Sequence, residues 1–80
     1  MSDFKVELDT SGLNCPLPVL KARKALDSLD AGERLHLIAT DQGAQKDIPA
    51  FCKMTDNPLV EMNEQNDKLH FIIEKGNSNG

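Results

Sequence analysis

One cysteine, Cys15, stands in a setting that favours sulfur chemistry. It is followed by Pro16 and Pro18 and then by apolar residues at helical spacing. Proline is well tolerated in the first turn of a helix, because the amide groups there have no carbonyl partner within the helix. The pattern places Cys15 at a helix N-terminus, where the helix dipole contributes roughly half a positive charge. Such a site stabilises a thiolate, so we expect a lowered thiol pKa and a nucleophilic sulfur.

Three basic residues follow Cys15 within the same predicted helix. Lys21, Arg23 and Lys24 lie in a segment, residues 13–26, that contains no acidic residue. They would add a local positive field in a chain that is acidic overall. Since one pKa unit corresponds to about 1.4 kcal/mol, this field and the helix terminus together suffice to shift the thiol pKa by about a unit. The alternative is that these three charges form a solvated outer helix face.

The second cysteine, Cys52, follows Phe51 directly and lies four residues after Ile48. This spacing on a helix favours a small, buried apolar residue. The alternative is a secondary thiol that forms a disulfide with Cys15 under oxidation. That pairing would require the two Cα atoms to lie within about 7 Å of each other.

The two histidines, His36 and His70, alternate with apolar residues in two predicted strands. We therefore expect them as a surface pair on the face of the sheet that carries no helix. Ile38 and Ile72 would share this face and could form a small apolar patch for a partner. The histidines and cysteines have no ligand-like spacing, so we expect no metal site and no cofactor.

The overall composition excludes several classes of function. The chain has 80 residues, a formal net charge of −4 and three Phe as its aromatic residues. This balance disfavours phosphate binding and base stacking, so we expect no direct contact with nucleic acid. The N-terminus lacks a signal-peptide pattern, and no apolar run has the length of a membrane span. We expect a cytoplasmic protein without membrane contact, whose cysteines are thiols.

Hydrophobic periodicity predicts six elements in one domain over residues 1–80. The predicted strands cover residues 4–8, 33–40, 59–62 and 68–75, and the predicted helices cover residues 16–29 and 44–55. A loop with Gly12 relieving the backbone leads to Cys15. The helix over 44–55 contains Pro49, so either Asp47 caps its real start or the helix begins earlier and bends at the proline. We expect an ordered core over about residues 4–75 and a flexible tail over 76–80.

The element order β-α-β-α-β-β predicts an α+β two-layer sandwich. Two helices would cover one face of a four-stranded mixed sheet. The first strand, helix and strand should form a right-handed crossover unit. The last two strands should form a hairpin.

Two motifs resemble those of the TusA-like (SirA-like) sulfur-carrier family. The first is Cys15-Pro16-Leu17-Pro18, preceded by Leu-Asp-Thr-Ser-Gly-Leu-Asn over residues 8–14. The second is the stretch Asp-Ile-Pro-Ala-Phe-Cys over residues 47–52, which is similar to the second-helix motif of that family. The resemblance extends over about residues 5–75, nearly the whole chain.

The resemblance implies the same β-α-β-α-β-β sandwich and a sulfurtransferase that acts as a protein sulfur carrier. Cys15 would accept a sulfur atom as a persulfide and pass it to a cysteine of an acceptor protein. Gly12, Pro16 and Pro18 would position this residue. The basic residues of the first helix would assist electrostatically or in docking.

The donors in this family include cysteine desulfurases, and a rhodanese-type protein is a second class of donor. The acceptors lead to tRNA thiolation, sulfur oxidation or cofactor sulfuration. Leu17 stands where many members of the tRNA pathway have an acidic residue, so the resemblance leaves the pathway open. A carrier that docks on several partners is expected to be a monomer.

A function of another class is compatible with the same residues. The chain would be a non-enzymatic adaptor, or a redox-responsive regulator, that binds a partner through its first helix. Cys15 would then be a capping residue or a redox sensor, and a Cys15→Ser variant would keep its function. Reversing the charge of Lys21 or Arg23 would abolish that function.

Overall fold

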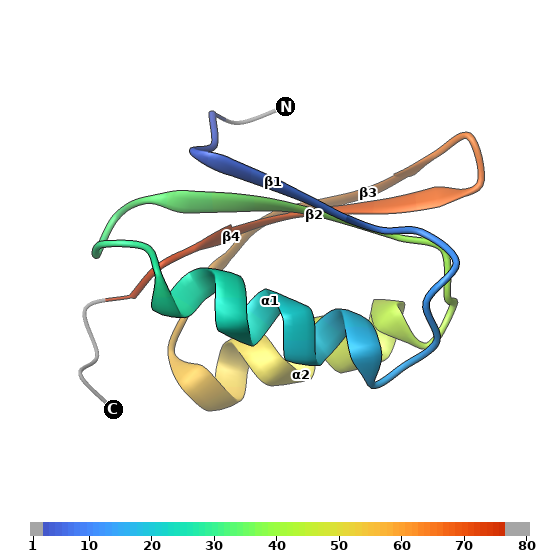
Figure 1. Ribbon diagram of the computed structural model, residues 1–80, viewed down its shortest axis with the longest axis horizontal. Helices are drawn as coiled ribbons and strands as arrows, with labels where there is room; N and C mark the ends of the chain where they lie inside the picture. Colours follow the sequence, from blue (N-terminus) through green and yellow to red (C-terminus); the bar gives the residue numbers. More distant parts are fainter. Residues whose placement is uncertain (1–2, 77–80) are drawn as a thin grey trace.

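The computed structural model describes residues 3–76, and its elements follow the predicted order. They are β1 (Val6–Thr10), α1 (Leu17–Asp27), β2 (Arg34–Ala39), α2 (Ala44–Thr55), β3 (Leu59–Gln65) and β4 (Lys68–Glu74). The sheet order is β1-β2-β4-β3, with β1 parallel to β2 and the other neighbours antiparallel. Both helices cover one face of this sheet (Figure 1), which confirms the predicted α+β two-layer sandwich. Apart from Gly76, the tail predicted to be flexible lies outside the described residues.

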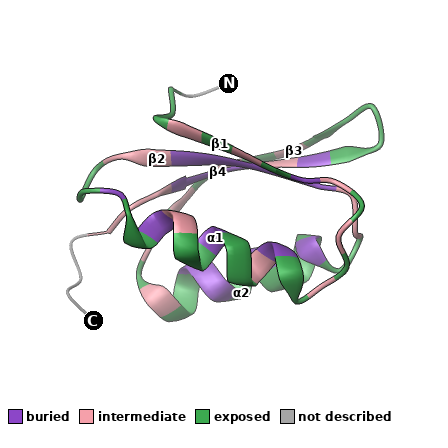
Figure 2. Ribbon diagram, viewed as in Figure 1, coloured by how far each residue is buried: buried purple, intermediate pink, exposed green. Residues whose placement is uncertain are grey.

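The core lies between the sheet and the two helices. Alternate residues of each strand face it, because successive side chains of a strand point to opposite faces. Each helix contributes one buried stripe, and its outer side is exposed (Figure 2). The fully buried side chains of this layer include Leu26, Leu35, Leu37, Ile48, Leu69, Phe71 and Ile73. Neither helix within residues 3–76 has the length and apolarity needed to cross a membrane.

The helices keep close to their predicted bounds. Helix α1 has Pro16 as its N-cap and Pro18 in its first turn, as the tolerance of this turn for proline predicts. Helix α2 starts at Ala44, so Asp47 does not cap it and Pro49 lies inside the helix.

The strands differ more from prediction at their ends. β1 begins at Val6, and Phe4 precedes it as an exposed residue. β3 continues to Gln65, because the hairpin turn needs only Asn66 and Asp67. These two residues have φ values of 53° and 64°, the left-handed conformation that a tight two-residue hairpin turn requires.

The helix-free face of the sheet is more covered than predicted. His36 is only 6% exposed, so the expected surface pair of histidines is wrong for this residue. Its Nε2 lies 3.0 Å from Nδ1 of His70, and its Nδ1 lies 3.1 Å from Oε1 of Glu7. The ring of Phe4 lies against it, with 4.9 Å between the ring centroids. The neighbouring side chains therefore bury a residue that strand alternation places on an open face.

The apolar patch expected on this face is also wrong. Ile72 is fully buried and Ile38 is nearly so. Each stands opposite a histidine of the adjacent strand, Ile72 opposite His36 and Ile38 opposite His70. Cross-strand neighbours lie close enough for large side chains to cover one another. Ile72 leaves no apolar surface for a partner, and Ile38 leaves very little.

The parallel pairing of β1 and β2 decides which loops meet. Thr10 and Ala39, at the ends of the two strands, are partners, so both following loops leave the sheet at one edge. The buried Thr10 hydroxyl donates to the Ile38 carbonyl over 2.5 Å, and the Gly12 N–H donates to Thr40 Oγ1 over 2.8 Å. The first bond joins the two strands, and the second joins the loop that carries Cys15 to the loop that precedes α2. Both loops lie at the right of Figure 1.

Candidate functional site

Cys15 is a partly buried free thiol at the end of the loop between β1 and α1. It directly precedes the N-cap Pro16, to which it is joined by a cis peptide bond. The Leu17 N–H donates to the Asn14 carbonyl over 2.9 Å, which closes the turn around the cysteine. Gly12 earlier in this loop has a φ of 83°, a conformation that glycine adopts without steric penalty. The sequence prediction that Cys15 lies at a helix N-terminus is therefore confirmed.

The sulfur also lies beside the start of the second helix. The Cys15 N–H donates to Oδ2 of Asp41 over 3.0 Å. A Cβ atom placed on Gly43, the N-cap of α2, would lie 3.1 Å from this oxygen and 3.5 Å from the Cys15 sulfur. The site therefore brings together one loop from each parallel strand.

Carboxylates, not cations, dominate the electrostatics of the sulfur. Burial raises the pKa of the Cys15 thiol to about 12, and hydrogen bonds from the thiol to Asp41 and Asp47 and their negative charges act in the same direction. The expected lowering of this pKa is thus wrong. Each helix N-terminus supplies roughly half a positive charge, whereas two carboxylates supply two full negative charges. The hydrogen bonds to Cys15 in turn lower the pKa of Asp41.

The basic residues of α1 lie on the solvent side of that helix. Lys21, Arg23 and Lys24 are exposed, and none is among the groups that shift the pKa of Cys15. The predicted electrostatic assistance by these residues therefore stays a prediction, as they lie on the exposed side of the helix. A role of these residues in docking stays a prediction.

Cys52 lies in the core layer. It is 3% exposed and packs in the cluster that includes Ile48 and Phe51, which confirms it as a small buried residue. Burial raises the pKa of its thiol to about 11. Both cysteines are free, and a disulfide between Cys52 and Cys15 under oxidation stays a prediction.

The surface next to Cys15 is partly apolar. Leu17 is 44% exposed and Leu20 is 53% exposed, and both lie in the first half of α1. Lys21 and Lys24 follow them at i+4, so these four residues share one helix face. We refer to Leu17, Leu20, Lys21 and Lys24 as the α1 outer face. It combines apolar area with positive charge beside the thiol.

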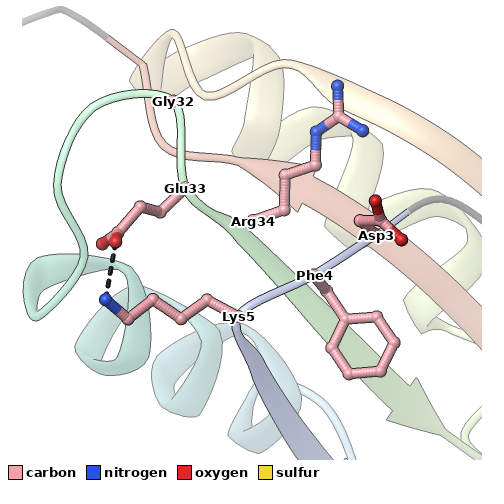
Figure 3. Close-up of a pocket in the computed structure, with 6 residues that line it drawn as sticks. All are labelled: Asp3, Phe4, Lys5, Gly32, Glu33 and Arg34. Atoms are coloured by element: carbon pink, nitrogen blue, oxygen red, sulfur yellow. Dashed lines mark hydrogen bonds and ion pairs between the residues drawn. The ribbon is translucent and has the colours of Figure 1, made fainter.

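A depression of about 350 Å³ lies at the other end of the sheet (Figure 3). It is lined by Asp3, Phe4, Lys5, Gly32, Glu33 and Arg34. These residues lie at the starts of β1 and β2, whereas Cys15 and Asp41 follow the ends of the same strands. An ion pair of 2.7 Å between Lys5 and Glu33 joins its walls. The depression contains no thiol and is separate from the sulfur site.

The carboxylates of Asp41 and Asp47 are the site residues that the sequence analysis missed. Asp41 directly follows the strand that pairs in parallel with β1, and this position was a usable signal. Parallel neighbours direct their following loops to one edge of the sheet, so an acid after β2 meets the loop after β1. Across residues 3–76, no three His, Cys, Asp or Glu side chains gather as a metal site would require.

Comparisons with known proteins agree with this geometry. The sequence model described as Sulfurtransferase TusA matches residues 6–75. The chain is 55% identical over 75 residues to the sulfur carrier protein TusA of Allochromatium vinosum, which covers 94% of this chain and 99% of that protein. It is 41% identical over 69 residues to the putative sulfur carrier protein YrkI of Bacillus subtilis, covering 86% and 92% of the two chains.

A SirA-like protein from Desulfitobacterium hafniense has the same fold. Its crystal structure matches with a TM-score of 0.81 and 24% sequence identity, over 90% of this chain and 99% of that one. The family model spans residues 6–75, and the identity to a TusA protein is 55%, so these two comparisons show the family as well as the fold. The chain with its thiol at the tip of α1 belongs to the TusA family of sulfurtransferases, whose members act as sulfur carriers.

Proposed function

We propose that this chain, as a single cytoplasmic carrier domain, takes a sulfur atom onto Cys15 as a persulfide and delivers it to an acceptor protein. The observation that carries the proposal is a free, partly buried thiol at a loop end, next to the exposed apolar and basic α1 outer face. A carrier must present its sulfur to two different proteins, and a sulfur at the tip of a helix can be reached by both.

Each transfer exchanges one S–S bond for another. In loading, the Cys15 thiolate attacks the outer sulfur of a donor persulfide, and the donor sulfur leaves with the electron pair of the broken bond. Cys15 loses its proton before the attack, and the leaving donor thiolate takes up a proton afterwards. In delivery, an acceptor thiolate attacks the outer sulfur and Cys15 leaves. Each transfer needs no external oxidant or reductant, because the cysteine sulfur that receives the outer sulfur is oxidised as the one that gives it up is reduced.

The partners that fit this chemistry are proteins with persulfide or thiol groups on accessible loops. A cysteine desulfurase or a rhodanese-type protein would be the donor. The acceptor would serve tRNA thiolation, sulfur oxidation or cofactor sulfuration, and the chain itself would act as a monomer without binding nucleic acid. The α1 outer face would dock these partners, with Gly12, Pro16 and Pro18 fixing the cysteine during the exchange.

Loading of sulfur can be measured directly. After incubation with a cysteine desulfurase and cysteine, or with a rhodanese-type donor, the intact mass should rise by one sulfur atom. Cys15→Ser should abolish this gain, whereas Cys52→Ala should retain it because Cys52 lies in the core. A wild-type chain that gains no sulfur from either class of donor would contradict the proposal.

The α1 outer face also favours a second candidate, a non-enzymatic adaptor or redox-responsive regulator. Apolar area beside positive charge suits binding to an acidic partner without any sulfur transfer. In that case Cys15→Ser would bind its partner as wild type does, and Lys21→Glu would not bind. A carrier instead loses transfer in Cys15→Ser while binding is kept.

A further inference from the structure

Asp41 makes the structural connection between the sulfur and the rest of the fold. Its Oδ2 accepts the Cys15 N–H over 3.0 Å, and its carbonyl accepts the Ala44 N–H over 3.0 Å. One residue thus holds the loop before α1 and also closes the turn before α2. The sulfur lies close enough to this turn that a Cβ on Gly43 would be 3.5 Å from it.

The charged groups that face the sulfur come from two segments. Asp41 comes from the loop after β2 and Asp47 from the first turns of α2, and the carboxylates of both raise the pKa of the Cys15 thiol. From α1, the basic side chains are directed to solvent and do not counter these charges. Among residues 3–76, the charged groups that shift the pKa of the bare thiol are therefore two carboxylates and no cation.

We propose that Asp41 is a positioning residue for the sulfur: it fixes the Cys15 backbone and, with Asp47, keeps the bare sulfur an uncharged thiol until a donor is docked. This inference rests on the proposed function, because it describes how the same sulfur is handled between transfers. An uncharged thiol reacts slowly with oxidants and small electrophiles, since the thiolate is the nucleophile. Asp41 thus protects an empty carrier from unwanted reactions.

Loading changes this situation, because a persulfide is more acidic than its thiol. The loaded form can therefore ionise under conditions in which the bare form does not. Cys15 loses its proton before its thiolate attacks, and the leaving donor thiolate takes up a proton afterwards, so the exchange consumes no proton overall.

The test compares alkylation of Cys15 across pH in wild type, Asp41→Asn and the control Asp27→Asn, all in a Cys52→Ala background. Asn keeps an oxygen for the Cys15 N–H but lacks the charge. Asp27 is an exposed carboxylate at the end of α1. At pH 8 we expect Asp41→Asn to react with iodoacetamide about tenfold faster, which corresponds to one unit of pKa. Asp27→Asn should stay within about twofold of wild type.

A second readout separates charge from mere structure. Iodoacetate is an anion and iodoacetamide is neutral, so the carboxylates should slow the former more. The rate ratio of iodoacetate to iodoacetamide should rise in Asp41→Asn and stay unchanged in the control. An unchanged pH profile and ratio in a folded Asp41→Asn protein overturns the proposal. If that variant does not fold, Asp47→Asn, which keeps the bond to the Cys15 N–H, must shift the profile, and an unshifted profile overturns the proposal.

Sulfur loading, followed by intact mass in parallel, keeps the two proposals apart. A wild-type chain that loads sulfur, together with an Asp41→Asn variant that titrates like wild type, removes the role of Asp41 and leaves the carrier function. A wild-type chain that fails to load removes the carrier function, whatever the alkylation profiles are. Loading by wild type together with a shifted Asp41→Asn profile supports both.

Discussion

At the scale of single residues, the chemistry of this protein depends on how Cys15 is protonated. Helix N-termini favour a thiolate, but burial and the carboxylates of Asp41 and Asp47 raise the pKa of this thiol to about 12. An empty carrier with this pKa is unreactive toward small electrophiles between transfers, since the thiolate is the nucleophile. In the complex with its donor, Cys15 must lose its proton before it attacks the donor persulfide.

The raised thiol pKa values predict a loss of stability at alkaline pH. For Cys15 and Cys52, the native state holds its proton more tightly than the unfolded chain, in which a thiol titrates near 8.5. Tighter proton binding stabilises the native state fully below pH 8.5, and this stabilisation is lost as the pH rises toward about 11 to 12. The free energy of unfolding in urea should therefore fall more steeply above pH 9 in wild type than in Cys52→Ala. Equal slopes would contradict the raised pKa of Cys52.

At the scale of elements, α2 contains an internal proline and has a C-cap residue in the left-handed conformation. The helix runs through Pro49, which removes one hydrogen-bond donor, and it is stabilised by its buried stripe rather than by propensity. It ends at Thr55, and its C-cap Asp56 has a φ of 58° and an N–H that donates to the Cys52 carbonyl. This is the left-handed cap position that glycine occupies most readily.

Replacing this cap residue should therefore stabilise the protein. Asp56→Gly removes the left-handed strain, and we expect a gain of roughly 0.5–1 kcal/mol in the free energy of unfolding. The same change at Asp27, in the right-handed last turn of α1, should destabilise by up to about 1 kcal/mol. Thermal or urea unfolding of both variants checks the opposite signs. A destabilised Asp56→Gly protein would show that the aspartate side chain has a role of its own.

At the scale of the whole molecule, the charge is unevenly distributed. The chain has a net charge of −4, yet its α1 outer face carries Lys21 and Lys24 beside the thiol. A basic area on an acidic protein orients it toward an acidic partner during association. The proposed docking surface and the thiol thus lie next to each other at the start of α1.

Charge reversal on this face should weaken docking without changing the sulfur. We expect Lys21→Glu to raise the KM for the donor protein several-fold and to leave the alkylation rate of Cys15 unchanged. Lys68→Glu, an exposed lysine of β4, is the matched control and should behave as wild type. Steady-state loading at two salt concentrations measures this, since added salt should weaken wild-type docking as well. Equal KM values for both variants would exclude the α1 outer face as the docking surface.

The sequence by itself determined the element order and the place of Cys15. Alternation in the strands, the apolar stripe of each helix, and the prolines at positions 16 and 18 are local signals, and each acts within a few residues. The sandwich follows from them because such faces are buried only by packing against one another. The motif around Cys15 likewise lies in one continuous stretch of chain.

Only the tertiary structure decided the surroundings of that sulfur. Asp41 lies 26 residues after Cys15 and reaches it through the parallel pairing of β1 and β2. The burial of His36 on the helix-free face also depends on neighbours that are distant in sequence, Glu7 and His70. A pKa reflects every charge and every shielding atom within a few ångströms, so the protonation of Cys15 could not be predicted from its own segment.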